Sequence, residues 1–142
     1  MGQQQLLLLV LAAVIVGVSV VVGINMFSQN ALTSNIDAVK QDCLSIAARA
    51  QEWYRKPAVL GGGAHSFSGL TFEDLGYGSG LTTSYTNEHG TFTIDPTAGT
   101  SIDISGVTVE TDGSGATWTV SYSTVTSTSM GTLAVTQTAS GG

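Results

Sequence analysis

The sequence predicts an α+β fold in which one long N-terminal α-helix, apolar in its first half and amphipathic in its second, packs on a small antiparallel β-sheet of about four strands. Three observations support this: a long apolar stretch at residues 6–23, a helical repeat of apolar residues that stops at Pro57, and alternating apolar residues after position 88. They divide the chain into residues 1–28 (apolar helix), 29–57 (amphipathic helix), 58–88 (glycine-rich connection) and 89–142 (sheet).

The first element is an apolar stretch in which Ser19 is the one polar residue between Leu6 and Gly23. A helix needs about 20 apolar residues to cross the hydrocarbon layer of a bilayer, and this run continues to Phe27. A secretory signal peptide is the competing interpretation, but such peptides begin with basic residues and have an apolar core of roughly 7–15 residues. No Lys or Arg precedes Lys40. We therefore expect a retained apolar helix.

The second element continues the same helix with an apolar stripe on one face. Its residues follow one another at spacings of three and four, which is the repeat of a helix with one buried side. Pro57 is expected to end the helix, so the whole rod would hold about 50 residues and be about 75 Å long. The stripe expected to pack on the sheet consists of Leu32, Ile36, Val39, Cys43, Ile46, Ala50 and Trp53.

The third element is the sheet, predicted from period-two alternation of β-branched and aromatic residues. The four strands are expected in the stretches TFTIDP, SIDISGVTVE, ATWTVSYS and GTLAVTQT. In the second stretch the alternation changes phase at Gly106, which predicts a bulge or tight turn there and places Val107 and Val109 inward. Residues 58–88 show weak periodicity and are interpreted as a connecting loop, with Gly61–Gly63 as a flexible exit and a turn of helix at Thr71–Leu75.

Composition excludes several functional classes. The chain has four Lys and Arg, ten Asp and Glu, and a formal net charge of −6, and no Lys or Arg follows Lys56. Phosphate binding needs cations, so we expect no nucleic-acid partner. The single cysteine, Cys43, excludes an intrachain disulfide and lies on the apolar stripe, where a buried small hydrophobe is expected.

No cluster of side chains predicts catalysis or cofactor binding. His65 and His89 have no second His or Cys at a spacing typical of metal ligands, so no metal is expected. The stretch TDGSG at residues 111–115 has too few carboxylates for a calcium loop and is interpreted as a plain turn. Gly61–Gly63 lacks the lysine of a phosphate-binding loop. We expect no enzyme activity and no cofactor.

An apolar helix, its amphipathic continuation, a glycine-rich connection and a small antiparallel sheet together resemble a type IV pilin or a type IV pilin-like filament subunit. The stretch AQEWYRKPAVLGGGAHSFSG, at residues 50–69, is similar to the helix exit of some bacterial pilin-like proteins. The resemblance implies cleavage after a glycine, matched here by Gly2 and Gln3, and methylation of the new amino terminus. The glutamate that many bacterial pilins carry five residues into the mature chain falls on Gln5 or Leu7, depending on whether that chain starts at Met1 or Gln3.

The resemblance also implies partners and a location. The subunit would reside in the cytoplasmic membrane, meet the pilus assembly machinery, and then join copies of itself in a cell-surface filament whose core is a bundle of apolar helices. Residues expected in that bundle are Gln5, Leu6, Leu9, Ala13, Val16, Gly17, Val20 and Gly23. Adhesion, motility or another surface interaction would be the role of the filament.

Two alternative functions stay open from the sequence. The chain could be a pseudopilin or minor pilin of a secretion or uptake apparatus, or a membrane-anchored surface protein that never polymerises.

The conformation of the apolar helix also stays open. The helix could be continuous, with Gly17 and Gly23 allowing close helix packing. It could instead unwind between Val16 and Gly23, because glycine and β-branched residues are weak helix formers. A further hypothesis places the acidic head of one subunit against residues 40–56 of another.

Overall fold

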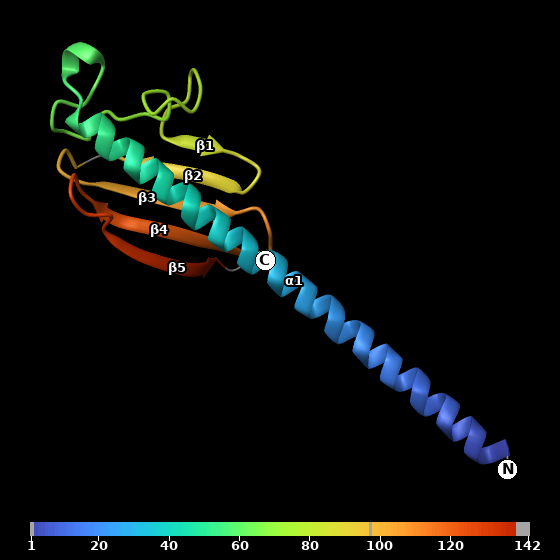
Figure 1. Cartoon of the computed structure of the whole chain (residues 1–142). Coiled ribbons are helices and arrows are strands. Elements are labelled where there is room, and N and C mark those ends of the chain that lie inside the picture. Colours follow the sequence, from blue (N-terminus) through green and yellow to red (C-terminus); the bar gives the residue numbers. More distant parts are fainter. Residues whose placement is uncertain (1, 97, 139–142) are drawn as a thin grey trace.

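The computed structural model describes residues 2–96 and 98–138 and is dominated by one helix, α1 (Gly2–Arg55), of 54 residues. The helix ends just before Pro57, as predicted, and would be about 80 Å long at 1.5 Å per residue. It runs without interruption through Gly17 and Gly23, so the local unwinding is not present in this structure. The second half of α1 carries the sheet, and the first half projects alone (Figure 1).

The sheet is antiparallel with strand order β1-β2-β3-β4-β5, which agrees with the predicted α+β class. Its strands are β1 (Ser84–Thr86), β2 (Gly90–Asp95), β3 (Ile102–Thr108), β4 (Thr117–Val125) and β5 (Thr132–Thr138). It therefore has five strands where about four were expected. The additional strand, β1, lies in the predicted loop; it pairs with β2 through Tyr85 opposite Phe92, whose rings are 6.2 Å apart.

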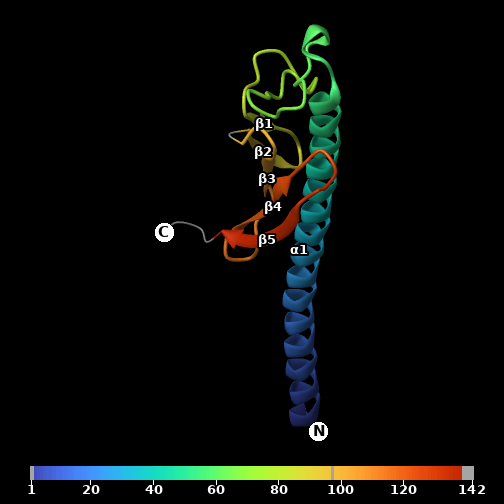
Figure 2. The ribbon, with the colours of Figure 1, turned by 90° about the vertical axis from the view of Figure 1, so that its left-hand side faces the viewer.

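The second half of α1 lies along one face of this sheet (Figure 2), and its apolar stripe packs there. Leu32, Val39, Cys43, Ile46 and Ala50 are buried, and Ile36 and Trp53 pack at the edge of the same core. Facing them are Phe92 and Ile94 of β2, Ile102 and Ile104 of β3, and Val120, Tyr122 and Val125 of β4. The second half of α1 is thus part of the core of the head, which we define as residues 29–138.

The predicted change of phase at Gly106 is wrong. Along β3 the buried positions continue at Ile102, Ile104, Gly106 and Thr108, while Val107 stays 37% exposed. A Cβ atom at Gly106 would lie 2.7 Å from a methyl carbon of Val39 and 2.8 Å from the ring of Phe92. Position 106 points inward and is a glycine because α1 approaches β3 closely there. The pairing of β3 with β4 does shift in register, but between Ile102 and Ile104.

The connection from α1 to β1 is a packed element, and the predicted flexible exit is wrong. It begins with a 3-10 helix, η1 (Ala58–Leu60), and then folds back on the end of α1. The amide of Gly63 donates to the carbonyl of Trp53 at 2.9 Å, and a side chain at Gly62 would collide with the carbonyl of Lys56. Later in the connection, four side chains enter the core, namely Phe67, Leu70, Phe72 and Leu75.

The predicted turn of helix at Thr71–Leu75 is a hydrogen-bonded turn. The Thr71 hydroxyl donates to the Asp74 carboxylate at 2.7 Å and accepts from the Asp74 amide at 3.2 Å. One bond of helical type, from the Leu75 amide to the Thr71 carbonyl at 3.3 Å, accompanies them. This turn directs Phe72 and Leu75 into the core.

Candidate functional site

The largest candidate surface is the apolar segment, which we define as residues 6–27 of α1. In its most apolar stretch of 18 residues nothing is buried by the rest of the chain, and its large hydrophobic side chains are 51% to 77% exposed. Its length and composition would allow it to cross a membrane. Burying one such side chain gains about 1.5–3 kcal/mol, so the segment represents tens of kcal/mol and requires an apolar environment.

The backbone groups of the apolar segment and the hydroxyl of its Ser19 are hydrogen-bonded within the helix. Its backbone is helical throughout, and the Ser19 hydroxyl donates to the carbonyl of Ile15 at 2.8 Å. An unpaired polar group in hydrocarbon costs several kcal/mol, and this bond avoids that cost at Ser19. The surface therefore suits lipid and an apolar protein bundle equally well.

The predicted bundle residues lie mostly on one side of this helix. At about 100° per residue, Gln5, Leu9, Ala13, Val16, Val20 and Gly23 share one face, with Leu6 and Gly17 at its edge. That face is roughly 130° around the axis from the stripe that packs on the sheet. A Cβ at Gly17 or Gly23 would meet nothing within 4 Å, so both positions leave room for another helix.

The processing site predicted at Gly2 and Gln3 is helical and exposed at the N-terminal end of α1. Gln5 is exposed on the same first turns of the helix. No acidic residue occupies the first turn of α1. The side-chain amides of Gln3, Gln4 and Gln5 are therefore polar groups available there for contacts with a neighbour.

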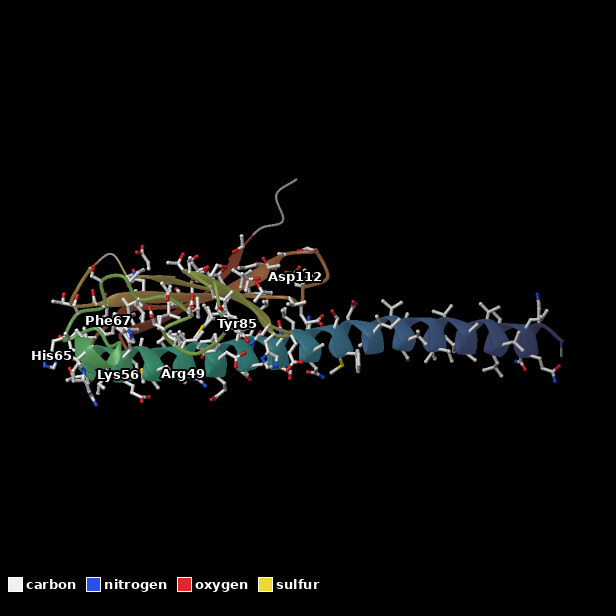
Figure 3. The ribbon with its side chains drawn as sticks, turned by 90° about the horizontal axis from the view of Figure 1, so that it is seen from above. Arg49, Lys56, His65, Phe67, Tyr85 and Asp112 are labelled. Atoms are coloured by element: carbon white, nitrogen blue, oxygen red, sulfur yellow. The ribbon has the colours of Figure 1, made fainter. Side chains whose placement is uncertain are left out.

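Three of the four basic side chains considered for contacts between subunits have partners within the chain, and Lys40 pairs with Asp37 at 3.2 Å. Arg49 donates to the carbonyl of Leu75 at 3.0 Å and stacks over the ring of Tyr77 at 4.7 Å. Arg55 donates to the carbonyl of Ser127 at 2.8 Å. Replacing Arg49 would therefore disturb the head itself. Lys56 is exposed at the end of α1 (Figure 3).

A groove of about 330 Å³ lies beside these cations. It is lined by Arg49, Glu52, Trp53, Lys56, Asp74 and Leu75. Two acidic and two basic side chains line it, and the guanidinium of Arg49 contacts the Leu75 carbonyl and the Tyr77 ring. The groove thus lacks the single sign of charge that selects a charged ligand.

The remaining candidates have structural roles. Burial, reinforced by the charge of Asp42, raises the pKa of Cys43 to about 12, so its thiol stays protonated. The Asp112 carboxylate accepts from the Ser114 hydroxyl at 2.5 Å and from the amides of Ser114 and Ala116, which lowers its pKa and fixes a plain turn. Among the described residues, no group of three or more His, Cys, Asp or Glu could hold a metal ion.

His89, unlike His65, joins the sheet to the helix. Its Nδ1 lies 2.7 Å from the carboxylate of Asp42, to which the side chain of Asn87 also donates at 3.0 Å. The carbonyl of His89 accepts from the side chain of Asn35 at 3.0 Å. These bonds fix the turn between β1 and β2 on α1. The sequence showed each residue but not their proximity, because helix and turn are 47 residues apart.

This contact predicts a pH dependence of stability. The hydrogen bond to Asp42 raises the pKa of His89 above its ordinary value of 6.5, so the folded state favours the protonated ring. The protonated His89 ring stabilises the folded state fully at pH values below the pKa of an unfolded histidine. This stabilisation is lost as the pH rises through the higher pKa that His89 has in the folded state. We expect the melting temperature of the full chain in detergent to fall between pH 6 and pH 8.

The control variants are His89→Gln and Asp42→Asn, which should both flatten this dependence. The Glu88 carboxylate lies 3.8 Å from Nε2 of His89, so Glu88→Gln should reduce the dependence only slightly. Equal pH profiles for the wild type and His89→Gln would contradict the assignment.

No protein-family model, curated protein or solved structure was found to match the chain.

Proposed function

We propose that this chain is the structural subunit of a type IV pilus-like filament and that it polymerises through the apolar segment. The observation that carries the proposal is the complete exposure of a membrane-length apolar helix that continues rigidly into a folded head. Such an apolar surface must be buried away from water, and a bundle of identical apolar segments buries it without further partners.

The rigid join favours a polymer over a simple membrane anchor. An anchor requires only a tether, whereas here the helix that leaves the head is the same helix whose stripe forms the core of the head. A rigid rod fixes the orientation of each head relative to the bundle. Neighbouring subunits would then meet in one repeated geometry, which a helical filament requires.

The energetics permit growth from a membrane pool. The apolar segment is covered by lipid before assembly and by other apolar segments afterwards, so its transfer never exposes it to water. Lipid and bundle offer similar surroundings, and van der Waals packing at small residues would favour the bundle. In this proposal an assembly machine extracts the subunit after processing at Gly2 and Gln3, and the fibre on the cell surface serves adhesion, motility or a similar interaction.

The direct test is to shear filaments from cells that produce the full chain, image them by electron microscopy and identify their protein by mass spectrometry. We expect fibres composed mainly of this chain. Bare cells, with the protein recovered only as monomers in detergent, would contradict the proposal and leave a membrane-anchored surface protein. Trace amounts in fibres of another subunit would identify a minor pilin.

A second test separates helix packing from lipid exposure. Gly17→Leu adds an apolar side chain, which lipid accepts but a closely packed bundle does not. We expect at least a tenfold loss of filaments, with unchanged amounts in the membrane and unchanged melting of the head. The matched control is Val18→Leu, about 100° further around the helix, which should assemble normally. Normal assembly of Gly17→Leu would exclude close packing at this position.

A further inference from the structure

An apolar tip protrudes from the head at the end of α1 that is far from the N-terminus (Figure 1). The tip comprises Pro57 and η1, and its Val59 and Leu60 are 96% and 65% exposed. These are large apolar side chains held in water outside the apolar segment. Their exposure calls for a partner surface.

The tip is held in one conformation by its backbone. The amides of Leu60 and Gly61 donate to the carbonyls of Pro57 and Ala58, each at 3.0 Å. Beyond it the amide of His65 donates to the carbonyl of Tyr54 at 2.8 Å, although φ of His65 is +67°, a value that costs a non-glycine residue energy. A preorganised apolar protrusion loses little entropy when it binds.

The opposite end of the head, near the point where the apolar segment leaves it, carries a second exposed patch. This base consists of Glu88, Val109 and Glu110; Val109 is 56% exposed and the side chain of Glu88 is 86% exposed. The base is also fixed to the helix, because the amide of Glu110 donates to the side chain of Asn35 at 3.2 Å. The amide of Val109 donates to the carbonyl of His89 at 3.1 Å.

The residues that precede the tip are basic and the base is acidic around an apolar centre, while Glu52 and Asp74 line the groove beside Lys56. Arg55 and Lys56 precede the tip, and Glu88 and Glu110 flank Val109 at the base. Figure 3 shows Lys56 and His65 at one end of the head and Asp112, in the turn that follows Glu110, at the other.

Other charged groups lie close to each end. Asp103 is at the start of β3, at the same end of the sheet as the tip, but its carboxylate accepts from the amide of Thr124 at 2.7 Å. Asp95 ends β2 nearby. Near the base, Lys40 pairs with Asp37 at 3.2 Å, and so the neighbouring cation is already neutralised.

We propose that the tip of one subunit docks on the base of a second copy of this chain, with Val59 and Leu60 against Val109 and the cations against the two glutamates. The two surfaces differ and lie at opposite ends, so the contact is heterologous and does not close on itself, which generates an open filament. This inference rests on the proposed function and names the contact between heads. Asn35 and Pro57 are 22 residues apart, so the contact would repeat about every 33 Å along the axis.

The test is a disulfide between subunits in filaments of a Val59→Cys, Val109→Cys variant. Cys43 is buried and does not compete. Mild oxidation of these filaments should give a ladder of dimers, trimers and longer chains on a denaturing gel, and either single variant should give none. The matched control is Val59→Cys, Leu133→Cys, because Leu133 is also exposed, at 46%, but lies on β5. Double-variant filaments without a ladder would overturn the docking and leave the proposed function standing.

Charge reversal provides a second measurement if the cysteine pair prevents assembly. Lys56→Glu should reduce filament yield at least tenfold, and adding Glu110→Lys should restore most of it. Normal yield for Lys56→Glu, or no recovery in the double variant, would overturn the docking. A wild-type chain that forms no filaments would overturn the proposed function itself.

Discussion

Lysine in place of Val16 is expected to abolish filament assembly while leaving the head folded. Val16 lies near the middle of the apolar segment, is 62% exposed and touches no part of the head. A charged side chain at the centre of a membrane helix costs about 2.5–3.5 kcal/mol, and in a bundle every subunit would carry that cost. Since 1.4 kcal/mol corresponds to a factor of ten, we expect about a hundredfold fewer filaments.

Filament yield after shearing measures the loss of assembly, and thermal unfolding of the head tests whether the head stays folded. The amount of protein in the membrane shows whether the variant still inserts. Val16→Leu is the matched control, because it keeps the position apolar and should assemble as the wild type does. The unfolding of the head, followed by tryptophan fluorescence of the full chain in detergent, should be unchanged in both variants. Normal filament yield for Val16→Lys would show that the middle of this segment lies in neither lipid nor a bundle.

The elements that could be predicted from sequence are those whose signals are local. The apolar run, the stripe from Leu32 to Trp53 and the stop at Pro57 each follow from residue type and spacing along one helix, and α1 has these features. The same holds for β2 and β4, where polar and apolar residues alternate over six or more positions. Patterns of this length select one period and leave little ambiguity. β5 was also predicted, from Leu133 and Val135, but its pattern is shorter and Leu133 is 46% exposed.

The elements that were missed depend on contacts distant in sequence. β1 has three residues, too few for an alternating pattern, and exists because Tyr85 pairs with Phe92. Phe67 and Phe72 are fully buried, yet their stretch follows no regular period because they enter the core from turns. The apolar character of Phe67 and Phe72 is the one local signal of their burial. Without a regular period it does not distinguish a buried turn from an exposed loop.

The candidate site also has one part that was predictable from local sequence and other parts that depend on contacts distant in sequence. The apolar segment is a property of composition, so the sequence revealed it completely. The use of Arg49 within the head could not be predicted, because its partner, the carbonyl of Leu75, is 26 residues away in an irregular connection. The apolar tip was likewise hidden, since Gly61–Gly63 are typical of a flexible loop and here form a tightly packed one.

Alanine at Gly106 is expected to destabilise the head by about 2–3 kcal/mol, the upper part of the roughly 1–3 kcal/mol that overpacking of a filled core typically costs. A Cβ there would lie 2.7 Å from Val39 and 2.8 and 2.9 Å from two ring atoms of Phe92. Both neighbours are fully buried, so neither can move aside into solvent. For a head of this size we expect the melting temperature of the full chain in detergent to fall by about 10 °C or more.

A double-mutant cycle identifies the cause of this loss. Val39→Ala removes the methyl group that the new Cβ would meet, so it should cost stability alone yet partly relieve Gly106→Ala. The double variant is expected to be more stable than the sum of the two single effects by about 1 kcal/mol. Gly113→Ala is the matched control, because a Cβ at Gly113 meets nothing within 4 Å. If the stability losses of the two single variants simply add, the new Cβ does not press against Val39. The close contact between α1 and β3 at this position would then be contradicted.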